Sequence, residues 1–242
     1  MSLQKNKTED NSVFKLASAT LYPLLFTLYL LLAASCGAAD PSAETLLQEA
    51  RLHPTAHPIT LSAIIRGAEQ PLPLTFKIEH GQIQYQLHDP EEVIILQLGP
   101  TTSSLSDTKQ GVKSSLNNDK RYQEVRNTGV TYDDLSLGFL YWPHPRLAGK
   151  ENLRGTTASI VELTPPPHQL SPYGSARLWI DEASGAPLRM EGWDKNGQRI
   201  KRFEVISAQK INGLWTLKEM RIETFDPTNH AVTQRRYLDV GR

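Results

Sequence analysis

The chain has 242 residues, with 26 basic and 26 acidic side chains and a single cysteine, Cys36. This balance of charge argues against nucleic acid as a partner, because a phosphate backbone rewards a basic excess. Since no cysteine follows Cys36, residues 40–242 can form neither a disulfide framework nor a thiolate metal site.

The first 39 residues have the layout of a secretory signal. Three lysines precede an apolar stretch over residues 16–34, and small residues continue to Ala39. The stretch is also long enough for a membrane-spanning helix. Either interpretation predicts export of the remainder, so residues 1–39 are expected to be a secretory or lipoprotein-type signal and residues 40–242 a single domain.

Cys36 has three interpretations, which the sequence leaves open. The string Leu32 to Gly37 resembles a bacterial lipoprotein signal, in which the cysteine is lipidated, although Ala33 departs from the usual branched aliphatic. Ordinary cleavage after Ala39 would remove the cysteine. It could also be a small apolar residue of the signal itself.

Residues 41–52 are expected to form the first helix, capped by Asp40 and with apolar side chains at helical spacing. From residue 59 the period changes to two. Residues 59–67, 72–79, 82–88 and 92–99 are predicted strands, with a turn at His80-Gly81. Residues 92–99 are expected to be the most deeply buried of these strands.

The middle of the chain is less regular. Residues 100–120 are polar and rich in turn formers, which predicts a long loop or ragged edge strands. Residues 131–141 predict a second helix, in which Thr131 and Asp134 have capping-box spacing. Residues 143–157 and 165–174 are predicted to be loops.

Strands return after Ser175, joined by turns at 183–186, Asn196-Gly197 and 226–229. Successive antiparallel strands of this length predict an up-and-down sheet, which must curl because twist accumulates. The fold class is therefore mainly β, within the α+β class: a single curved antiparallel sheet whose concave side is closed by short helices.

The search for chemistry finds no catalytic group of residues. The seven histidines do not converge, and Pro54 interrupts the helical spacing of His53 and His57. No nucleophile elbow or phosphate-binding glycine loop is present. We therefore expect no enzyme activity, no metal and no cofactor.

Four tryptophans, at positions 142, 179, 193 and 215, lie in or beside predicted elements. Each is expected to be core. A curved sheet with two short helices can nevertheless leave part of its concave face uncovered, and such a cavity would suit an acyl chain.

The C-terminal half resembles the outer-membrane lipoprotein-sorting protein family, the LolA/LolB-like superfamily. The shared features are a Trp-Ile-Asp strand, a Pro-Leu-Arg strand, an Asp-x-x-Gly turn, a Gly-x-Trp strand and a final strand with Thr, all between residues 175 and 240. The segment TYDDLSLGFLYWP, at 131–143, also resembles the helix that precedes this region in related proteins. The likeness covers roughly residues 125–240, and extends to the N-terminal strands only by topology.

The resemblance implies an incomplete β-barrel with helices closing its mouth and an apolar interior that holds acyl chains. The residues expected to contact lipid are Leu74, Phe76, Ile83, Tyr85, Leu135, Phe139 and Leu140. The implied protein is a monomeric carrier of lipid or lipoprotein acyl chains. It would lie in the periplasm or be anchored through Cys36 to a membrane facing it.

Two alternatives remain from the sequence. The fold also serves periplasmic sensors or scaffolds that bind an envelope protein partner, which would need a filled interior and an exposed edge or apolar surface. A lipid-modifying enzyme would need a nucleophile and base at the cavity mouth, and the sequence shows no such pair.

Overall fold

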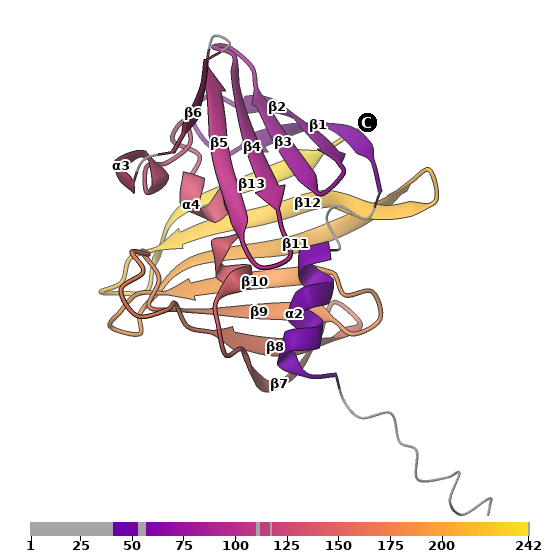
Figure 1. Ribbon diagram of the computed structural model, residues 1–242, viewed down its shortest axis with the longest axis vertical. Coiled ribbons are helices and arrows are strands. Elements are labelled where there is room, and N and C mark those ends of the chain that lie inside the picture. Colours follow the sequence, from indigo (N-terminus) through magenta and orange to yellow (C-terminus); the bar gives the residue numbers. More distant parts are fainter. Residues whose placement is uncertain (1–40, 53–56, 110–111, 117, 242) are drawn as a thin grey trace, which may run out of the picture. The chain divides into compact units, whose positions relative to one another are not determined.

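Thirteen strands form one antiparallel sheet in the computed structural model, which describes residues 41–52, 57–109, 112–116 and 118–241 (Figure 1). The predicted signal segment, including Cys36, lies outside these residues. The spatial order is β6-β5-β4-β3-β2-β1-β13-β12-β11-β10-β9-β8-β7, so the two ends of the domain meet at β1 and β13 while β6 and β7 are the free edges. The predicted fold class, a single open curved antiparallel sheet, is confirmed.

The strands are β1 (Ile59–Arg66), β2 (Leu72–Glu79), β3 (Gln82–Leu87), β4 (Glu92–Leu98), β5 (Ser103–Lys109), β6 (Val112–Ser115), β7 (Arg146–Leu153), β8 (Thr156–Leu163), β9 (Ser175–Asp181), β10 (Pro187–Trp193), β11 (Arg199–Ile211), β12 (Leu214–Phe225) and β13 (Val232–Val240). The helices are α2 (Ala43–Leu52), α3 (Asn118–Arg121), α4 (Tyr132–Leu135) and the 3₁₀ turn η2 (Gly138–Tyr141). No helix among the described residues is both long and apolar enough to cross a membrane.

The helix α2 confirms its predicted apolar stripe, with Ala43, Leu46, Leu47 and Ala50 all buried. Its start differs from the prediction. Ser42, rather than Asp40, caps the helix, because the Ser42 hydroxyl accepts a hydrogen bond of 3.1 Å from the Thr45 amide.

The predicted hairpin turns are confirmed, and the edge-strand alternative is confirmed for residues 103–109 and 112–115, which form β5 and β6. β4 alternates instead of being buried on both faces: Ile94 and Leu96 are fully buried, and Val93 and Ile95 are half-buried. The loop predicted at 143–157 is wrong, because residues 146–163 form the hairpin β7–β8. β7 has no apolar alternation, since seven of its eight residues are exposed at the sheet edge.

The predicted second helix is also wrong in part. Its capping box is present, with Thr131 and Asp134 bonded reciprocally. The helix stops after one turn, and Leu137 adopts a left-handed conformation, φ 50°, before η2 begins. Two short turns therefore replace one helix and point their apolar side chains in different directions.

The inner face of the sheet, defined by its buried apolar positions, carries two clusters of core residues. The first cluster lies on β1–β4 and β11–β13 and includes Val125 and Val130 from the segment before α4 and Tyr132 from α4 itself. The second lies on β8–β10 and includes α2 and η2. In Figure 1, α2 crosses the orange strands, and α4 and η2 lie between those strands and the magenta ones.

The outer face carries a row of alternating charge across seven neighbouring strands, which we call the charged row. Its members, in order from β7 to β13, are Arg146, Glu162, Arg177, Glu191, Arg202, Glu223 and Arg235. Glu162 lies 2.8 Å from both Arg146 and Arg177, and Glu223 lies 2.8 Å from Arg235. Opposite charges directly across a strand pair favour one register, so the row helps to fix the alignment of this half of the sheet.

Candidate functional site

Five of the seven predicted lipid contacts lie together in the first core cluster. Leu74, Ile83 and Tyr85 are buried in the cluster, while Phe76 and Leu135 are partly buried against it. The Phe76 and Tyr85 rings pack edge to face, with 5.5 Å between centroids. Burial raises the pKa of the Tyr85 hydroxyl, which therefore stays neutral.

The remaining two, Phe139 and Leu140, belong to the second cluster. Leu140 is 3 % exposed, and Phe139 packs against the cluster without being fully buried. The break at Leu137 causes this division, because α4 faces one cluster and η2 the other. Leu137 and Phe203 pack against both clusters, so the two groups of predicted contacts adjoin along the inner face.

The covering element is a stretch that we call the inner segment, residues 118–142. It contains α3, α4 and η2 but no named strand, and one isolated bridge, Glu124 to Thr131, closes its turn. Val125, Val130 and Tyr132 fill the space beside the predicted contacts on β2 and β3. The predicted contacts are therefore covered by the chain's own side chains.

Polar contacts anchor the inner segment to the N-terminal strands. The Tyr132 hydroxyl donates a hydrogen bond of 2.9 Å to Glu92 on β4, and Lys120 lies 3.3 Å from the same carboxylate. Lys120 also pairs with Asp107 on β5. The Glu92 and Asp107 side chains are 5 % and 3 % exposed, so these charges are compensated inside the fold. Burial and the hydrogen bond to Glu92 raise the pKa of the Tyr132 hydroxyl.

A second anchor joins the inner segment to the C-terminal strands. The buried Asp134 accepts a hydrogen bond from the Tyr173 hydroxyl, and its other oxygen lies 3.8 Å from Lys201 on β11. Lys201 donates to the carbonyl of Gly129. Burial, with the nearby Asp134 charge, raises the pKa of the Tyr173 hydroxyl well above its usual value. This hydroxyl therefore keeps its proton and serves as the hydrogen-bond donor to Asp134.

Glycine at position 192 makes this second anchor sterically feasible. A Cβ atom added at Gly192 would lie 2.3 Å from the Tyr173 ring. The ring therefore packs directly on the β10 backbone.

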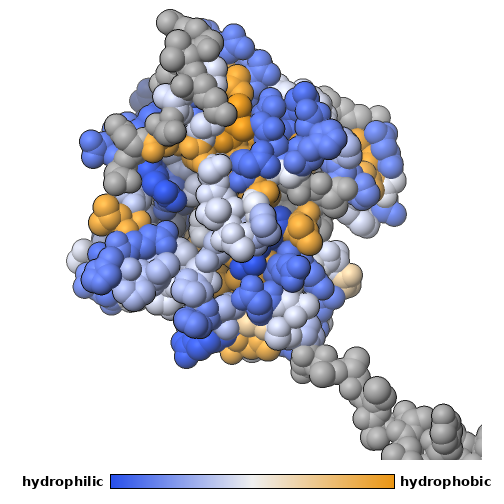
Figure 2. All heavy atoms as spheres, viewed as in Figure 1, coloured by the Kyte–Doolittle hydropathy of each residue, from blue (hydrophilic) through white to orange (hydrophobic). Residues whose placement is uncertain are grey.

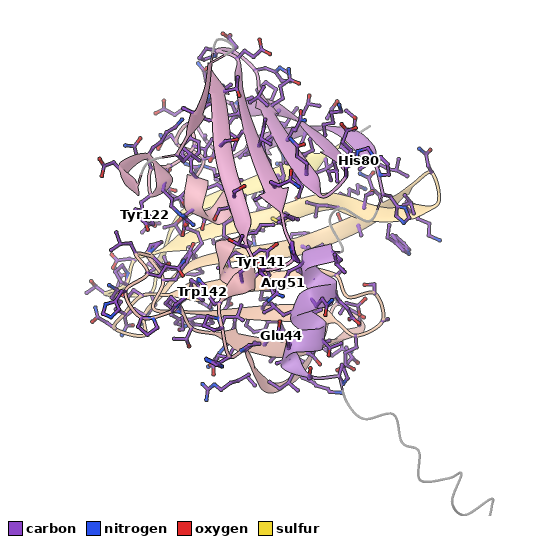
Figure 3. All side chains as sticks on the ribbon, in the orientation of Figure 1. Glu44, Arg51, His80, Tyr122, Tyr141 and Trp142 are labelled. Carbon is purple, nitrogen blue, oxygen red and sulfur yellow. The ribbon has the colours of Figure 1, made fainter. Side chains whose placement is uncertain are left out.

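The helix α2 is attached to η2 by Arg51, as Figure 3 shows. Arg51 Nε donates to the Leu140 carbonyl at 2.7 Å, and its guanidinium lies 5.0 Å from the Tyr141 ring centroid. The Tyr141 hydroxyl continues the connection by donating to the Gly99 carbonyl at 3.0 Å, in the turn after β4. These three groups link the helix, the inner segment and the N-terminal strands.

Trp142 contributes an unusual polar group to the second cluster. Its side chain is 3 % exposed, and its indole Nε1 has no hydrogen-bond partner among the described residues. A buried donor without an acceptor is costly, and such groups in native proteins call for an explanation.

The described residues offer little for catalysis or metal binding. They contain no group of three or more His, Cys, Asp or Glu placed to hold a metal ion. A surface hollow of about 220 Å³ is lined by Tyr122, Leu170, Ser171 and Pro172. None of these residues is among the seven predicted lipid contacts. On the face shown in Figure 2, the described residues are mostly hydrophilic, with small separate apolar patches.

Sequence reasoning missed the anchors, although it located the apolar positions. Glu92 stands at the start of a predicted strand, and Lys201 lies on the same face of β11 as the apolar Phe203. Their partners are up to 72 residues away, as in the bond from Lys201 to Gly129. The Thr131–Asp134 spacing was the one local signal, and it identified the cap without its link to Tyr173.

Comparison with known proteins identifies the fold. A family model described only as an uncharacterized protein matches residues 109–240, which is more than half of the chain. No curated protein sequence matches.

Three solved structures are similar over most of their length. A domain described as an outer membrane lipoprotein-sorting protein, from Vibrio parahaemolyticus, is 15 % identical, covers 83 % of this chain and 92 % of its own, and has a TM-score of 0.63. A LolA superfamily protein from Nitrosomonas europaea is 15 % identical, with coverage of 84 % and 93 % and a TM-score of 0.60. A DUF1329 family protein from Desulfovibrio piger is 16 % identical, with coverage of 83 % and 90 % and a TM-score of 0.62. At these identities the similarity establishes the fold alone.

Proposed function

This chain belongs to the family whose model spans residues 109–240 and has the LolA-like fold, and from that premise we propose that it is a lipid- or lipoprotein-binding carrier of the cell envelope. Its cargo would be an acyl chain, held between the inner face of the sheet and the inner segment. Binding would draw its energy from apolar burial and would involve no chemical step.

The observation that carries this proposal is how the inner segment is attached. It covers Leu74, Ile83 and Tyr85 without joining the sheet as a strand, and ion pairs and hydrogen bonds at Glu92 and Asp134 hold it in place. Moving it away would expose apolar positions on β2 and β3 while leaving the strand ladder intact. An acyl chain could then replace the side chains that fill the space.

Trp142 gives the proposal a second support. The orphaned indole N–H lies in the apolar cluster beneath α2 and η2. An ester or amide carbonyl at the head of an acyl chain would supply the acceptor that the described residues lack. The seven predicted contacts and Trp142 would then serve the tail and the head of one ligand.

The test is native mass spectrometry of the full chain, isolated from envelopes without detergent and then extracted with organic solvent. A carrier should retain stoichiometric lipid or acylated peptide. The variants Leu135→Ala and Phe139→Ala, both of half-buried side chains, should lower the bound fraction, while Leu170→Ala should not, because Leu170 is 61 % exposed and outside both clusters. A clean apo mass that also takes up no added phospholipid would overturn the proposal.

The alternative is an envelope sensor or scaffold that binds a protein partner. The observation that favours it is the filled interior, since Leu74, Ile83 and Tyr85 are each at most 8 % exposed. Cross-linking in envelopes followed by identification of one stoichiometric protein, with no extractable lipid, would support this second function.

Residues 1–39 complete the proposal as the export signal, with Cys36 either lipidated or removed. The carrier would act as a monomer, in the periplasm or attached to a membrane facing it. Metabolic labelling with a fatty acid, with Cys36→Ala as the matched control, distinguishes an anchored protein from a free one.

A further inference from the structure

The end of the β11–β12 hairpin presents the most exposed large apolar side chain among the described residues. Trp215 is 66 % exposed, whereas Trp142 and Trp179 are 3 % and 5 % exposed. In Figure 1 the turn joining β11 and β12 projects beyond the neighbouring strands. An isolated indole at a projecting turn is poorly explained by packing.

Along the chain, the hairpin end that carries Trp215 has charge of one sign. Residues 205–218 contain Lys210 and Lys218 and no acidic residue. Both lysines are exposed, and Lys210 Nζ lies 5.1 Å from the Trp215 ring centroid. The next carboxylate along the chain, Glu219, is paired with Arg66 at 3.4 Å.

The hairpin holds this end rigidly. Asn212 and Gly213 both have positive φ, 52° and 84°, as a two-residue turn requires. Ile211 beside the turn is buried in the first core cluster. Gln209 adds a side-chain hydrogen bond of 2.8 Å to the carbonyl of Val240 on β13. Trp215 is therefore presented on an ordered support, so binding costs little ordering of the backbone.

We propose that the end of this hairpin, with Trp215, Lys210 and Lys218, docks the protein on the surface of an anionic phospholipid bilayer. Tryptophan favours the headgroup level of a bilayer, where its ring is buried and its N–H stays solvated. Lysines on the same hairpin end gain from the negative surface potential. The absence of acidic residues over 205–218 removes the opposing repulsion. This docking goes beyond cargo binding and does not depend on it.

The test uses the full chain and vesicles of phosphatidylcholine, with or without phosphatidylglycerol. Trp215 should shift its emission to shorter wavelength and lose access to iodide on the anionic vesicles alone. Trp215→Phe should keep most of the binding but lose the spectral change, while Trp215→Ala should lose binding as well.

The charge is tested with Lys210→Gln and Lys218→Gln. Each lysine near an anionic surface is worth about 1 kcal/mol, so each change should weaken vesicle binding about fivefold. Added salt should also weaken the binding of the wild-type protein to anionic vesicles. Leu170→Ala, which removes another exposed apolar side chain, is the control and should bind as the wild type does.

Equal binding of Trp215→Ala and wild type to anionic vesicles would overturn the proposal. So would the absence of wild-type binding, or a Trp215-dependent complex with an envelope protein and none with vesicles. Extraction of lipid from the same preparations tests the carrier function separately. Vesicle binding by a protein that neither holds extractable cargo nor takes up added phospholipid would leave the docking intact and reject the carrier.

Discussion

At the scale of single residues, the buried carboxylate of Asp134 needs hydrogen-bond and ion-pair partners from the side chains and backbone around it. Its side chain is 3 % exposed and satisfies the Thr131 backbone, the Tyr173 hydroxyl and the Lys201 ammonium group. A buried charge of this kind is tolerated only while its partners remain. Loss of a partner should therefore cost more than an average hydrogen bond.

We expect Tyr173→Phe to lower the free energy of unfolding by about 1.5–3 kcal/mol, because the hydrogen bond it removes is made to a charged acceptor. Urea unfolding at neutral pH measures this loss. Tyr237→Phe is the matched control: the Tyr237 ring lies under Arg66, 5.3 Å from the guanidinium carbon, and its hydroxyl makes no buried hydrogen bond to any residue that the structure describes. A loss below 0.5 kcal/mol, the range of an ordinary surface change, would show that water replaces the hydroxyl.

At the scale of elements, the charged row favours one alignment of the seven strands that it crosses. Glu223 has a fully buried side chain and accepts hydrogen bonds from Arg202 and Arg235. Burial alone would raise the pKa of its carboxyl, but these two arginines outweigh burial and lower it. The pKa of Glu204 is lowered in the same way by Arg189 and Arg221, against the effect of burial.

Acid should therefore weaken this half of the sheet. A carboxyl whose pKa is lower in the folded state contributes stability above its unfolded pKa, about 4.3, and loses it as pH falls through the folded value. We expect the free energy of unfolding to decrease as pH falls below about 4.3. In the variant Glu223→Gln, the free energy of unfolding should be lower at neutral pH and should decrease less as the pH falls.

The exposed Glu69→Gln is the control for this pH dependence, since it should follow the wild-type curve. Urea midpoints measured between neutral pH and mild acid give the comparison. Identical slopes for Glu223→Gln and wild type would show that the row does not carry the acid sensitivity.

For each element, the sequence predicts the structure correctly where residues a few positions apart determine it. The hairpins at Asn196-Gly197 and at 183–186 are correct because their turn residues and alternation lie within a few positions. β7 was missed because an exposed edge strand needs no apolar side chains. The helix predicted over 131–141 failed at Leu137, where packing against both clusters favours a left-handed residue that propensity disfavours.

For the candidate site, too, the sequence predicts the local pattern and misses the contacts between distant residues. Alternation correctly placed Leu74, Ile83 and Tyr85 on the inner face. What alternation cannot give is the partner of a buried polar group, because the Tyr132–Glu92 and Tyr173–Asp134 bonds join residues 40 and 39 positions apart. Nor does composition distinguish Trp215 from the buried tryptophans, since exposure at a turn depends on where the hairpin ends.

At the scale of the whole sheet, the two anchors of the inner segment lie on opposite halves. The Tyr132–Glu92 bond attaches it to β4, and Asp134 attaches it to Tyr173 and to β11. The halves themselves are joined continuously through β1 and β13. Release of the inner segment therefore requires both anchors to open, while the sheet can stay whole.

This arrangement makes the combined variant Tyr132→Phe/Tyr173→Phe informative. Both rings remain, so the apolar lining is kept and only the two hydroxyl bonds are lost. If cargo enters beneath the inner segment, each lost bond, worth about 1.5–3 kcal/mol, should raise the open population at least about tenfold, up to the limit set by other contacts. Stopped-flow uptake of a fluorescent fatty acid should accelerate in each single variant and further in the double variant.

Tyr237→Phe, on the outer face, should leave the uptake rate unchanged. The informative contrast is between stability and uptake. A double variant that unfolds more readily but takes up the probe at the wild-type rate would place the entry route elsewhere on the inner face. Faster uptake of the probe with the same final occupancy would mean that the anchors control access to the interior. The affinity for the probe would then depend on the apolar residues of β2 and β3.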